Sequence, residues 1–258
     1  MKIKLLPSTF DERGCASPEQ RLSCFVIDDR VTIDAGSIAI GLNDAQRQTV
    51  RDVIITHPHM DHIATLPIFV DDLFALLDEP IRIHATEEVC GMIERDIFNG
   101  TVYPPFHKFS NDRTRVMEFV PFRMGEEFRV AHLRVTAVAV EHIVPTVGMV
   151  ISDGETSIAF SSDTSATEEF WHLVNRQPRV DALLIESSFP NSLSKLAAVS
   201  GHLTPEALRQ ELTKLTHTSL EILAVHLKPS FREQLIRELA DLGVPRLSAM
   251  EAGREYSW

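Results

Sequence analysis

Apolar residues along the chain recur with two different periods, and the changes between them predict the order of strands and helices. Short apolar segments at 1–6, 21–27, 31–34 and 52–55, broken by turn-forming residues, predict strands. From about residue 61 to 77 the spacing becomes helical. The apolar stripe of that helix consists of Leu66, Phe69, Val70, Leu73, Phe74 and Leu77.

The middle of the chain begins with a predicted strand near 81–84 and a helix from about 86 to 97. Residues 98–112 contain aromatic residues and prolines, and we expect an irregular loop there. Its rings at Tyr103, Phe106 and Phe109 either pack onto the core, which we favour, or stack on a purine. From 115 to 160 strands dominate, including a hairpin around Asp153-Gly154.

The last hundred residues or so alternate helices with buried strands at 181–185 and 221–225. Three helix starts are predicted, by Ser165 with Glu168, by Thr204-Pro205 and by Ser230 with Glu233, and the last helix ends near Gly243. No linker separates the halves. The pattern predicts one domain over residues 1–258, an α/β (α+β) sandwich of two sheets flanked by helices.

Several predicted strands end in polar residues of the kinds that bind metals. These residues are His57, Glu141-His142, Asp163, Glu186 and His226. A single His or Asp after a strand is more often an ordinary turn residue, but so many together overturn that interpretation. Since open α/β sheets bind ligands at the carboxyl ends of their strands, we expect these ends to meet at one edge.

The densest group is Thr56-His57-Pro58-His59-Met60-Asp61-His62, directly after an apolar strand. Imidazole and carboxylate together suit zinc and other divalent metals. Three histidines and an aspartate are too many for one tetrahedral ion that must also hold water and substrate. The spacing suggests two adjacent ions, with His57 and His59 facing one and Asp61 and His62 the other.

Composition and charge narrow the class of partner. The chain has 25 basic and 37 acidic residues, a net charge of −12, which disfavours a nucleic-acid polymer. A small anionic substrate remains compatible, because bound divalent cations would dominate the local field. No apolar run is long enough for a membrane span, so we expect no membrane association. The three irregularly spaced cysteines predict free thiols and a cytoplasmic location.

With these motifs in place, the chain resembles the metallo-β-lactamase superfamily, marked by His-x-His-x-Asp-His followed by a distant His, an Asp and a final His. The resemblance covers nearly the whole chain and implies a four-layer αββα sandwich with two metal ions. By that pattern His57, His59 and His142 would hold one ion, and Asp61, His62 and His226 the other. Asp163 and a hydroxide would bridge the two ions. We expect zinc first, with manganese or iron as alternatives.

A narrower likeness is to class II 3′,5′-cyclic-nucleotide phosphodiesterases. It is carried by the segments Ile33–Ser37, Ser161–Thr164, Ile185–Asn191, Ser200–Pro205 and Val225–Pro229. Met60, Thr65 and Pro67 depart from that family's first motif but leave every ligand in place. These departures affect the assignment to the phosphodiesterase subgroup more than they affect the expected metal chemistry.

The same likeness implies roles for His202 and Glu186. In related phosphodiesterases of the superfamily, a His in a comparable segment donates a proton to the leaving oxygen and is oriented by a Glu after a strand. His202 alone could equally be a surface residue before a helix. We favour the catalytic role, and we count Asp61, His202 and Glu186 as the catalytic residues.

The predicted function is hydrolysis of cyclic AMP or cyclic GMP to the 5′-monophosphate by a metal-bridging hydroxide. The nearest alternative is a ribonuclease Z-type transfer-RNA 3′-processing nuclease, which the charge and the lack of a basic Gly-rich arm disfavour. A thioesterase or lactonase would leave Glu186 and His202 incidental. A cyclic-nucleotide-binding sensor without catalysis is the alternative from a different class. The exposed part of helix 61–77, with the family resemblance, also suggests a homodimer.

Overall fold

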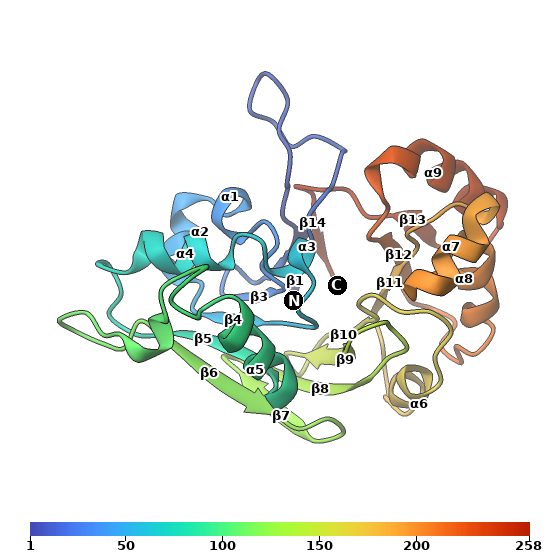
Figure 1. The fold of residues 1–258 in the computed structure, drawn as a ribbon. Helices are drawn as coiled ribbons and strands as arrows, with labels where there is room; N and C mark the ends of the chain where they lie inside the picture. Colours follow the sequence, from blue (N-terminus) through green and yellow to red (C-terminus); the bar gives the residue numbers. More distant parts are fainter. The chain divides into compact units, whose positions relative to one another are not determined.

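The computed structural model describes all residues from 1 to 258, and they form two compact units. The N-terminal unit comprises residues 2–123 and 252–257, and the C-terminal unit comprises Met1, residues 124–251 and Trp258. Each unit contains one mixed sheet of seven strands with its own helices (Figure 1). The prediction of two sheets flanked by helices is confirmed, and the single domain over 1–258 stays a prediction.

The sheet of the N-terminal unit has the order β14-β1-β2-β3-β4-β5-β6. Its strands are β1 (Lys2–Leu5), β2 (Phe25–Ile27), β3 (Val31–Ile33), β4 (Asp52–Ile54), β5 (Ile81–Thr86), β6 (Met117–Phe122) and β14 (Glu255–Ser257). Pairing is antiparallel from β14 to β3 and parallel from β3 to β6. Short loops lead from the parallel strands β3 and β4 into helices, so this part of the sheet can carry a site at its carboxyl ends.

The helices of this unit are α1 (Ile38–Gly41), α2 (Asp44–Thr49), α3 (Met60–Ile63), α4 (Leu66–Leu73) and α5 (Glu87–Asp96). The single helix predicted over 61–77 is therefore two helices. The break has a physical reason: Pro67 occupies the first turn of α4, and the Thr65 hydroxyl donates to the Ala35 carbonyl and accepts from the Ala39 amide. The sequence pattern did not predict α1 and α2.

The aromatic loop packs onto the core, as we favoured. Phe106 is 3% exposed, and its ring lies about 6 Å from the rings of Phe74, Phe98, Tyr103 and Phe109. The expectation that the loop has no regular structure is wrong in one detail, because Phe106–Lys108 form a short 3-10 helix. The ring of Phe106 is unavailable for stacking on a base.

The sheet of the C-terminal unit has the order β13-β12-β11-β10-β9-β8-β7. Its strands are β7 (Glu127–Val130), β8 (Leu133–Ala139), β9 (Val147–Ser152), β10 (Ser157–Phe160), β11 (Ala182–Glu186), β12 (Glu221–Val225) and β13 (Leu247–Ala249). Pairing is parallel from β13 to β10 and antiparallel from β10 to β7. The predicted hairpin is β9 with β10.

The helices of the C-terminal unit are α6 (Glu169–Asn175), α7 (Ser194–Ser200), α8 (Pro205–Leu212) and α9 (Arg232–Asp241), with 3-10 turns at Asn191–Leu193 and Pro229–Phe231. In Figure 1, α6 lies beside β8 and β9, and α9 packs on β13 and α8. The sequence pattern did not predict α7.

Of the three predicted helix starts, one has the predicted cap. The Thr204 hydroxyl accepts from the Ala207 amide and begins α8. The Ser165 hydroxyl instead donates to the Glu141 carbonyl, and α6 begins four residues later at Glu169. Ser230 lies within the 3-10 turn before α9, which has no side-chain cap. For Ser165 the contact with Glu141 explains the difference.

The direction of the strands explains where the polar residues gather. In the C-terminal sheet β8, β10, β11 and β12 run the same way, so His142, Asp163, Glu186 and His226 follow the strands at one edge. The expectation that all the strand ends share an edge is wrong for His57, because β4 belongs to the other sheet. Sequence periodicity does not say which of two sheets a strand joins.

Each unit has its own apolar core. In the N-terminal unit Phe69 and Phe98 are among the largest fully buried side chains, and in the C-terminal unit Phe170 and Trp171 are buried together. The indole of Trp171 donates to the Glu211 carboxylate at 2.7 Å, which satisfies its polar atom. None of the helices combines the length and the apolar character that a membrane span requires.

Asp52 in β4 is an acid-sensitive contact of the N-terminal sheet. Its carboxylate accepts from the Arg82 guanidinium at 2.8 and 3.0 Å and bonds to the His84 imidazole at 2.8 Å. Burial alone would raise the pKa of Asp52, but the hydrogen bonds from His84 and Arg82 and the charge of Arg82 outweigh it and lower the pKa from 3.8 to about 2.

Because the folded pKa is depressed, the stability from Asp52 is complete above pH 4 and is lost as the pH falls towards 2. We expect the difference in unfolding free energy between the wild type and Asp52→Asn to shrink by about 1–2 kcal/mol over this range, allowing for solvent screening around Arg82. Urea unfolding at a series of pH values measures it. A difference that stays constant with pH would contradict the assignment.

Candidate active site

The N-terminal unit places its ligand-type residues at the carboxyl ends of β3 and β4. Asp34 directly follows β3, and its amide donates to the Ile54 carbonyl at 2.7 Å. Thr56 and His57 follow β4 and are fully buried, whereas His59 and Asp61 are half-buried at the start of α3. Asp34 has φ +60°, a left-handed conformation that costs about 1–3 kcal/mol for a residue other than glycine.

Asp34 organises this group through its side chain. It is fully buried, and its carboxylate accepts from the Thr56 amide at 2.9 Å, from the Thr56 hydroxyl at 2.9 Å and from His62 Nδ1 at 2.7 Å. An ionised carboxylate only accepts, so His62 must carry its proton on Nδ1. The neutral ring then presents the lone pair of Nε2.

His57 and His59 converge through their ring nitrogens. The Thr56 hydroxyl lies 3.0 Å from His57 Nδ1, and His57 Nε2 lies 3.1 Å from His59 Nδ1. Two imidazole nitrogens directed at one point are suited to a shared cation. Ligand atoms of His57 and His59 belong to one group that could hold a metal ion, and those of Asp61 and His62 belong to another. The donor set of imidazoles and a carboxylate fits a divalent metal.

Gly36 allows the backbone before the ligands to approach closely. A Cβ atom at this position would lie 2.0 Å from the Asp61 carbonyl oxygen and 2.7 Å from the Ser23 carbonyl oxygen. The Gly36 amide also donates to the Ser23 carbonyl at 2.9 Å, and the Ser23 amide donates to the Asp61 carbonyl at 2.8 Å. Gly36 therefore supports the ligand loop because no side chain fits between these backbone atoms.

We expect Gly36→Ala to destabilise the protein by at least about 1–3 kcal/mol, because the added methyl group overlaps fixed backbone atoms. Gly91→Ala is the matched control: it lies in α5 with no atom within 4 Å of the added Cβ. That change should be neutral or stabilise by up to about 1 kcal/mol. Denaturant unfolding of both variants compares them, and equal stability would contradict the proposed close contact.

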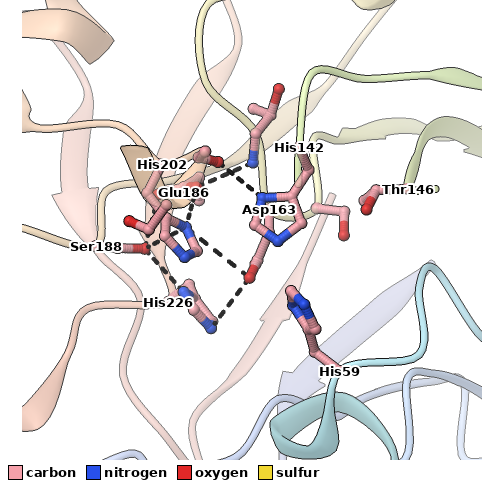
Figure 2. Close-up of polar contacts among 12 residues, drawn as sticks. His59, His142, Thr146, Asp163, Glu186, Ser188, His202 and His226 are labelled. Carbon is pink, nitrogen blue, oxygen red and sulfur yellow. Dashed lines mark hydrogen bonds and ion pairs between the residues drawn. The ribbon is translucent and has the colours of Figure 1, made fainter. Parts of the chain in front are cut away.

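The C-terminal unit gathers the other predicted site residues at the edge of its sheet (Figure 2). Asp163 is 2% exposed, and its Oδ2 lies 3.5 Å from His226 Nε2 and 4.0 Å from His202 Nδ1. Ligand atoms of these three side chains lie within 4.8 Å of one another, which is close enough for one metal ion. Ser162 and His226 have φ +55° and +59°, so the backbone is strained on both sides of the cluster.

Glu186 is the centre of hydrogen bonding in this group. It is fully buried, and its carboxylate accepts from the Thr164 amide at 2.9 Å, from the Leu203 amide at 3.2 Å, from the Ser188 hydroxyl at 2.7 Å and from His202 Nδ1 at 2.7 Å. Four donors on one side chain fix its position. The pairing of Glu186 with His202 places together two residues that the sequence resemblance linked.

The contact with Glu186 also changes the acidity of His202. Burial lowers its pKa, but the hydrogen bond to Glu186 and the charges of Glu186 and Asp163 raise the pKa above the ordinary histidine value. Because Nδ1 donates to the carboxylate, the proton available for transfer is on Nε2. His202 is therefore suited to protonate a leaving oxygen.

His142 has the opposite character. Burial lowers the pKa of His142 below the ordinary value, and its Nδ1 donates to the Gly201 carbonyl at 2.8 Å, which partly opposes that shift. A neutral ring with the proton on Nδ1 leaves Nε2 as a metal ligand. A Cβ on Gly201 would lie 2.8 Å from His142 Nδ1, and Gly201 has φ +70°, so only glycine suits this contact.

Four residues that position the site had no assigned role in the sequence analysis: Asp34, Thr56, Ser188 and Gly201. Each contacts a predicted ligand or proton donor through a hydrogen bond. Asp34, Ser188 and Gly201 lay within motifs that carried the resemblance, and Thr56 directly precedes the predicted ligand His57. Only their positions in or beside these motifs could have indicated a role. The ligands that Asp34, Gly201 and Ser188 contact are distant in the sequence.

This chain was compared with protein-family models, with curated proteins and with solved structures, and the three comparisons agree. A family model described as a beta-lactamase superfamily domain matches residues 29–247. A curated relative from Yersinia pestis, named "Probable 3′,5′-cyclic-nucleotide phosphodiesterase", is 26% identical over 217 residues, which cover 75% of this chain. The chain covers only 62% of that relative.

Two solved structures share the fold over nearly the whole chain. Unliganded yeast PDE1 is similar with a TM-score of 0.77 and 17% identity, covering 98% of both chains. The short form of human tRNase Z is similar with a TM-score of 0.67 and 15% identity, covering 100% of this chain and 99% of that one. At these identities the similarity establishes the fold.

Proposed function

This chain belongs to the metallo-β-lactamase superfamily of metal-dependent hydrolases, and from that premise we propose that it hydrolyses 3′,5′-cyclic nucleotides to 5′-monophosphates. The predicted fold class, the αββα sandwich of this superfamily, is confirmed. The observation that carries the proposal is the Glu186–His202 pair at 2.7 Å, next to Asp163 and His226. Expelling a ribose oxygen needs a proton donor, and this pair supplies one.

We further propose that two divalent ions are held by the predicted ligands. His57, His59 and His142 would hold one ion, Asp61, His62 and His226 the other, and Asp163 would be shared between them. Support comes from hydrogen bonds that place the Nδ1 proton on four histidines, so that Nε2 of the neutral ring is the nitrogen with a lone pair for a ligand bond; these are His57, His62, His142 and His226. Zinc is our first expectation, with manganese or iron as alternatives.

When bound, such a pair of ions lowers the pKa of water and offsets the charge of a phosphodiester during displacement. The chain's own residues then have separate tasks. His202 holds a proton on Nε2 for the departing 3′ oxygen, and Glu186 orients the ring of His202 and stabilises its charged form. The backbone amides of Thr164 and Leu203 keep Glu186 in place.

The substrate class follows from the Yersinia pestis relative and from the charge of the chain. A small phosphodiester fits a chain with a net charge of −12 better than a nucleic-acid polymer does. We also propose that the protein has no membrane partner. The three unpaired cysteines, of which Cys24 and Cys90 are buried, support a reducing compartment such as the cytoplasm.

A homodimer is also part of the proposal. Ile40 of α1 and Ile68 of α4 are 45% and 44% exposed, and Leu76 after α4 is 68% exposed. Sedimentation equilibrium of the purified protein tests this point independently of activity.

The decisive experiment is hydrolysis of cyclic AMP, cyclic GMP and bis(p-nitrophenyl) phosphate by purified protein, with elemental analysis of the same sample. We expect turnover of at least one cyclic nucleotide and two equivalents of metal. Metal-replete protein that binds a cyclic nucleotide tightly without turnover would support the sensor instead.

A ribonuclease Z-type activity is the second candidate, favoured by the shared fold with human tRNase Z. A gel-shift with transfer RNA at low salt separates the two, since a processing nuclease must grip the RNA backbone. Thioesters and lactones belong in the same substrate panel. Faster turnover of these than of cyclic nucleotides would leave the Glu186–His202 pair without its proposed task.

A further inference from the structure

Thr56 connects a buried carboxylate to a predicted ligand in the N-terminal unit. Its hydroxyl lies 2.9 Å from Asp34 Oδ1 and 3.0 Å from His57 Nδ1. A hydroxyl has one proton, and the carboxylate only accepts, so the proton of Thr56 is donated to Asp34. The hydroxyl oxygen can then only accept from His57, which requires the proton of that ring on Nδ1.

Ser188 makes the same connection in the C-terminal unit. Its hydroxyl donates to Glu186 Oε2 at 2.7 Å and lies 2.8 Å from His226 Nδ1 (Figure 2). The same accounting places a proton of His226 on Nδ1. In the neutral ring the lone pair is then on Nε2, which lies 3.5 Å from Asp163 Oδ2. Ser188 is fully buried, so water does not replace its hydroxyl.

The two units thus contain the same arrangement. In each unit a buried carboxylate bonds one imidazole directly, His62 or His202, and a second one through a hydroxyl, His57 or His226. A carboxylate behind a ligand histidine fixes its tautomer and raises its basicity. Here the hydroxyl group links the same carboxylate to a second imidazole ring.

We propose that Thr56 and Ser188 are positioning residues, whose hydroxyls fix the Nδ1–H tautomers of His57 and His226 so that the lone pair of each neutral ring is on Nε2, the nitrogen that would bind metal. The metal-binding role rests on the proposed function, whereas the tautomers are a property of the chain itself. Loss of one hydroxyl should therefore release the tautomer of one histidine and weaken metal binding without removing a ligand.

The test uses Thr56→Val and Ser188→Ala in the full-length protein. The chain supplies a matched control for each: Thr32→Val in β3 and Ser187→Ala beside Ser188. Both control hydroxyls are buried and have no hydrogen-bond partner. Each control therefore makes the same chemical change as its test variant without breaking a contact with a histidine. Thr56→Ser keeps the hydroxyl and serves as the conservative rescue.

Two measurements separate positioning from mere packing. The ¹⁵N spectra of the histidine rings in the metal-free protein report which nitrogen carries the proton. We expect Nδ1–H for His57 and His226 in the wild type, with Thr56→Val changing His57. Ser188→Ala should change His226, whereas His202, which lies 3.3 Å from the same hydroxyl, keeps its Nδ1 proton through the 2.7 Å bond to Glu186. Zinc affinity, measured by competition with a chelator, should fall about 10–100-fold in both variants, while Thr56→Ser and the two controls stay near the wild type.

Each outcome bears on the proposal. Unchanged ring spectra in Thr56→Val and Ser188→Ala would overturn it, as would an equal loss of zinc affinity in the two controls. A wild-type protein that shows the predicted tautomers but hydrolyses no phosphodiester would leave this inference standing and remove the proposed function.

Discussion

Replacing Asp163 by alanine is expected to remove bound metal and hydrolytic activity together. The carboxylate is buried beside the imidazoles of His202 and His226, and in the proposed site it is shared by both ions. Metal ions contribute several kcal/mol of transition-state stabilisation. Activity should therefore fall by about 10³-fold or more.

Elemental analysis and cyclic-nucleotide turnover on the same preparation measure both effects. Asp241→Ala, at the exposed end of α9, is the matched control and should keep metal and activity. An Asp163→Ala protein that keeps its turnover would exclude the shared-carboxylate mechanism.

His202→Ala should separate the two properties that Asp163→Ala removes together. We expect the variant to keep its metal and to lose about 10²–10⁴ in kcat on a cyclic nucleotide, because the leaving alkoxide is no longer protonated. Bis(p-nitrophenyl) phosphate releases a much weaker base, so its hydrolysis should depend far less on His202. The diagnostic quantity is the loss of kcat on the cyclic nucleotide divided by the loss on bis(p-nitrophenyl) phosphate.

The pH profile gives an independent check. The proposed mechanism needs a protonated His202 ring, and contact with Glu186 raises the pKa of His202, so wild-type kcat should fall as the pH rises through that pKa. The alkaline fall should disappear in His202→Ala. If the variant instead loses metal, His202 is a ligand alongside Asp163 and His226, a grouping that their distances also allow.

Most of the predicted site residues were recognisable from the sequence because they follow a strand or precede a helix, and Asp61 and His62 lie in the first helix after β4. Apolar runs such as Ala182–Ile185 predict buried strands, and the first polar residue after such a run lies at the edge of the sheet. The Glu186–His202 pair followed from the resemblance, and the observed hydrogen bond agrees with it.

The rest depends on tertiary contacts that leave no periodic trace. The break between α3 and α4 depends on Thr65 bonding to Ala35 and Ala39, thirty and twenty-six residues earlier. The capping role predicted for Ser165 failed because its amide and hydroxyl both donate to the Glu141 carbonyl, which holds this residue in the loop, and α6 begins only at Glu169. The hydroxyl contacts of Thr56 and Ser188 join strands whose pairing the sequence does not state.

The left-handed backbone of Asp34, Ser162 and His226 has a consequence for how such a protein can change over generations. Each conformation costs free energy and persists only because the surrounding structure holds it. The backbone beside the proposed site therefore lowers the stability of the folded protein towards heat. Lineages selected for heat resistance would have to gain it elsewhere in the two cores, because relaxing this backbone would misdirect the side chains that give the enzyme its activity.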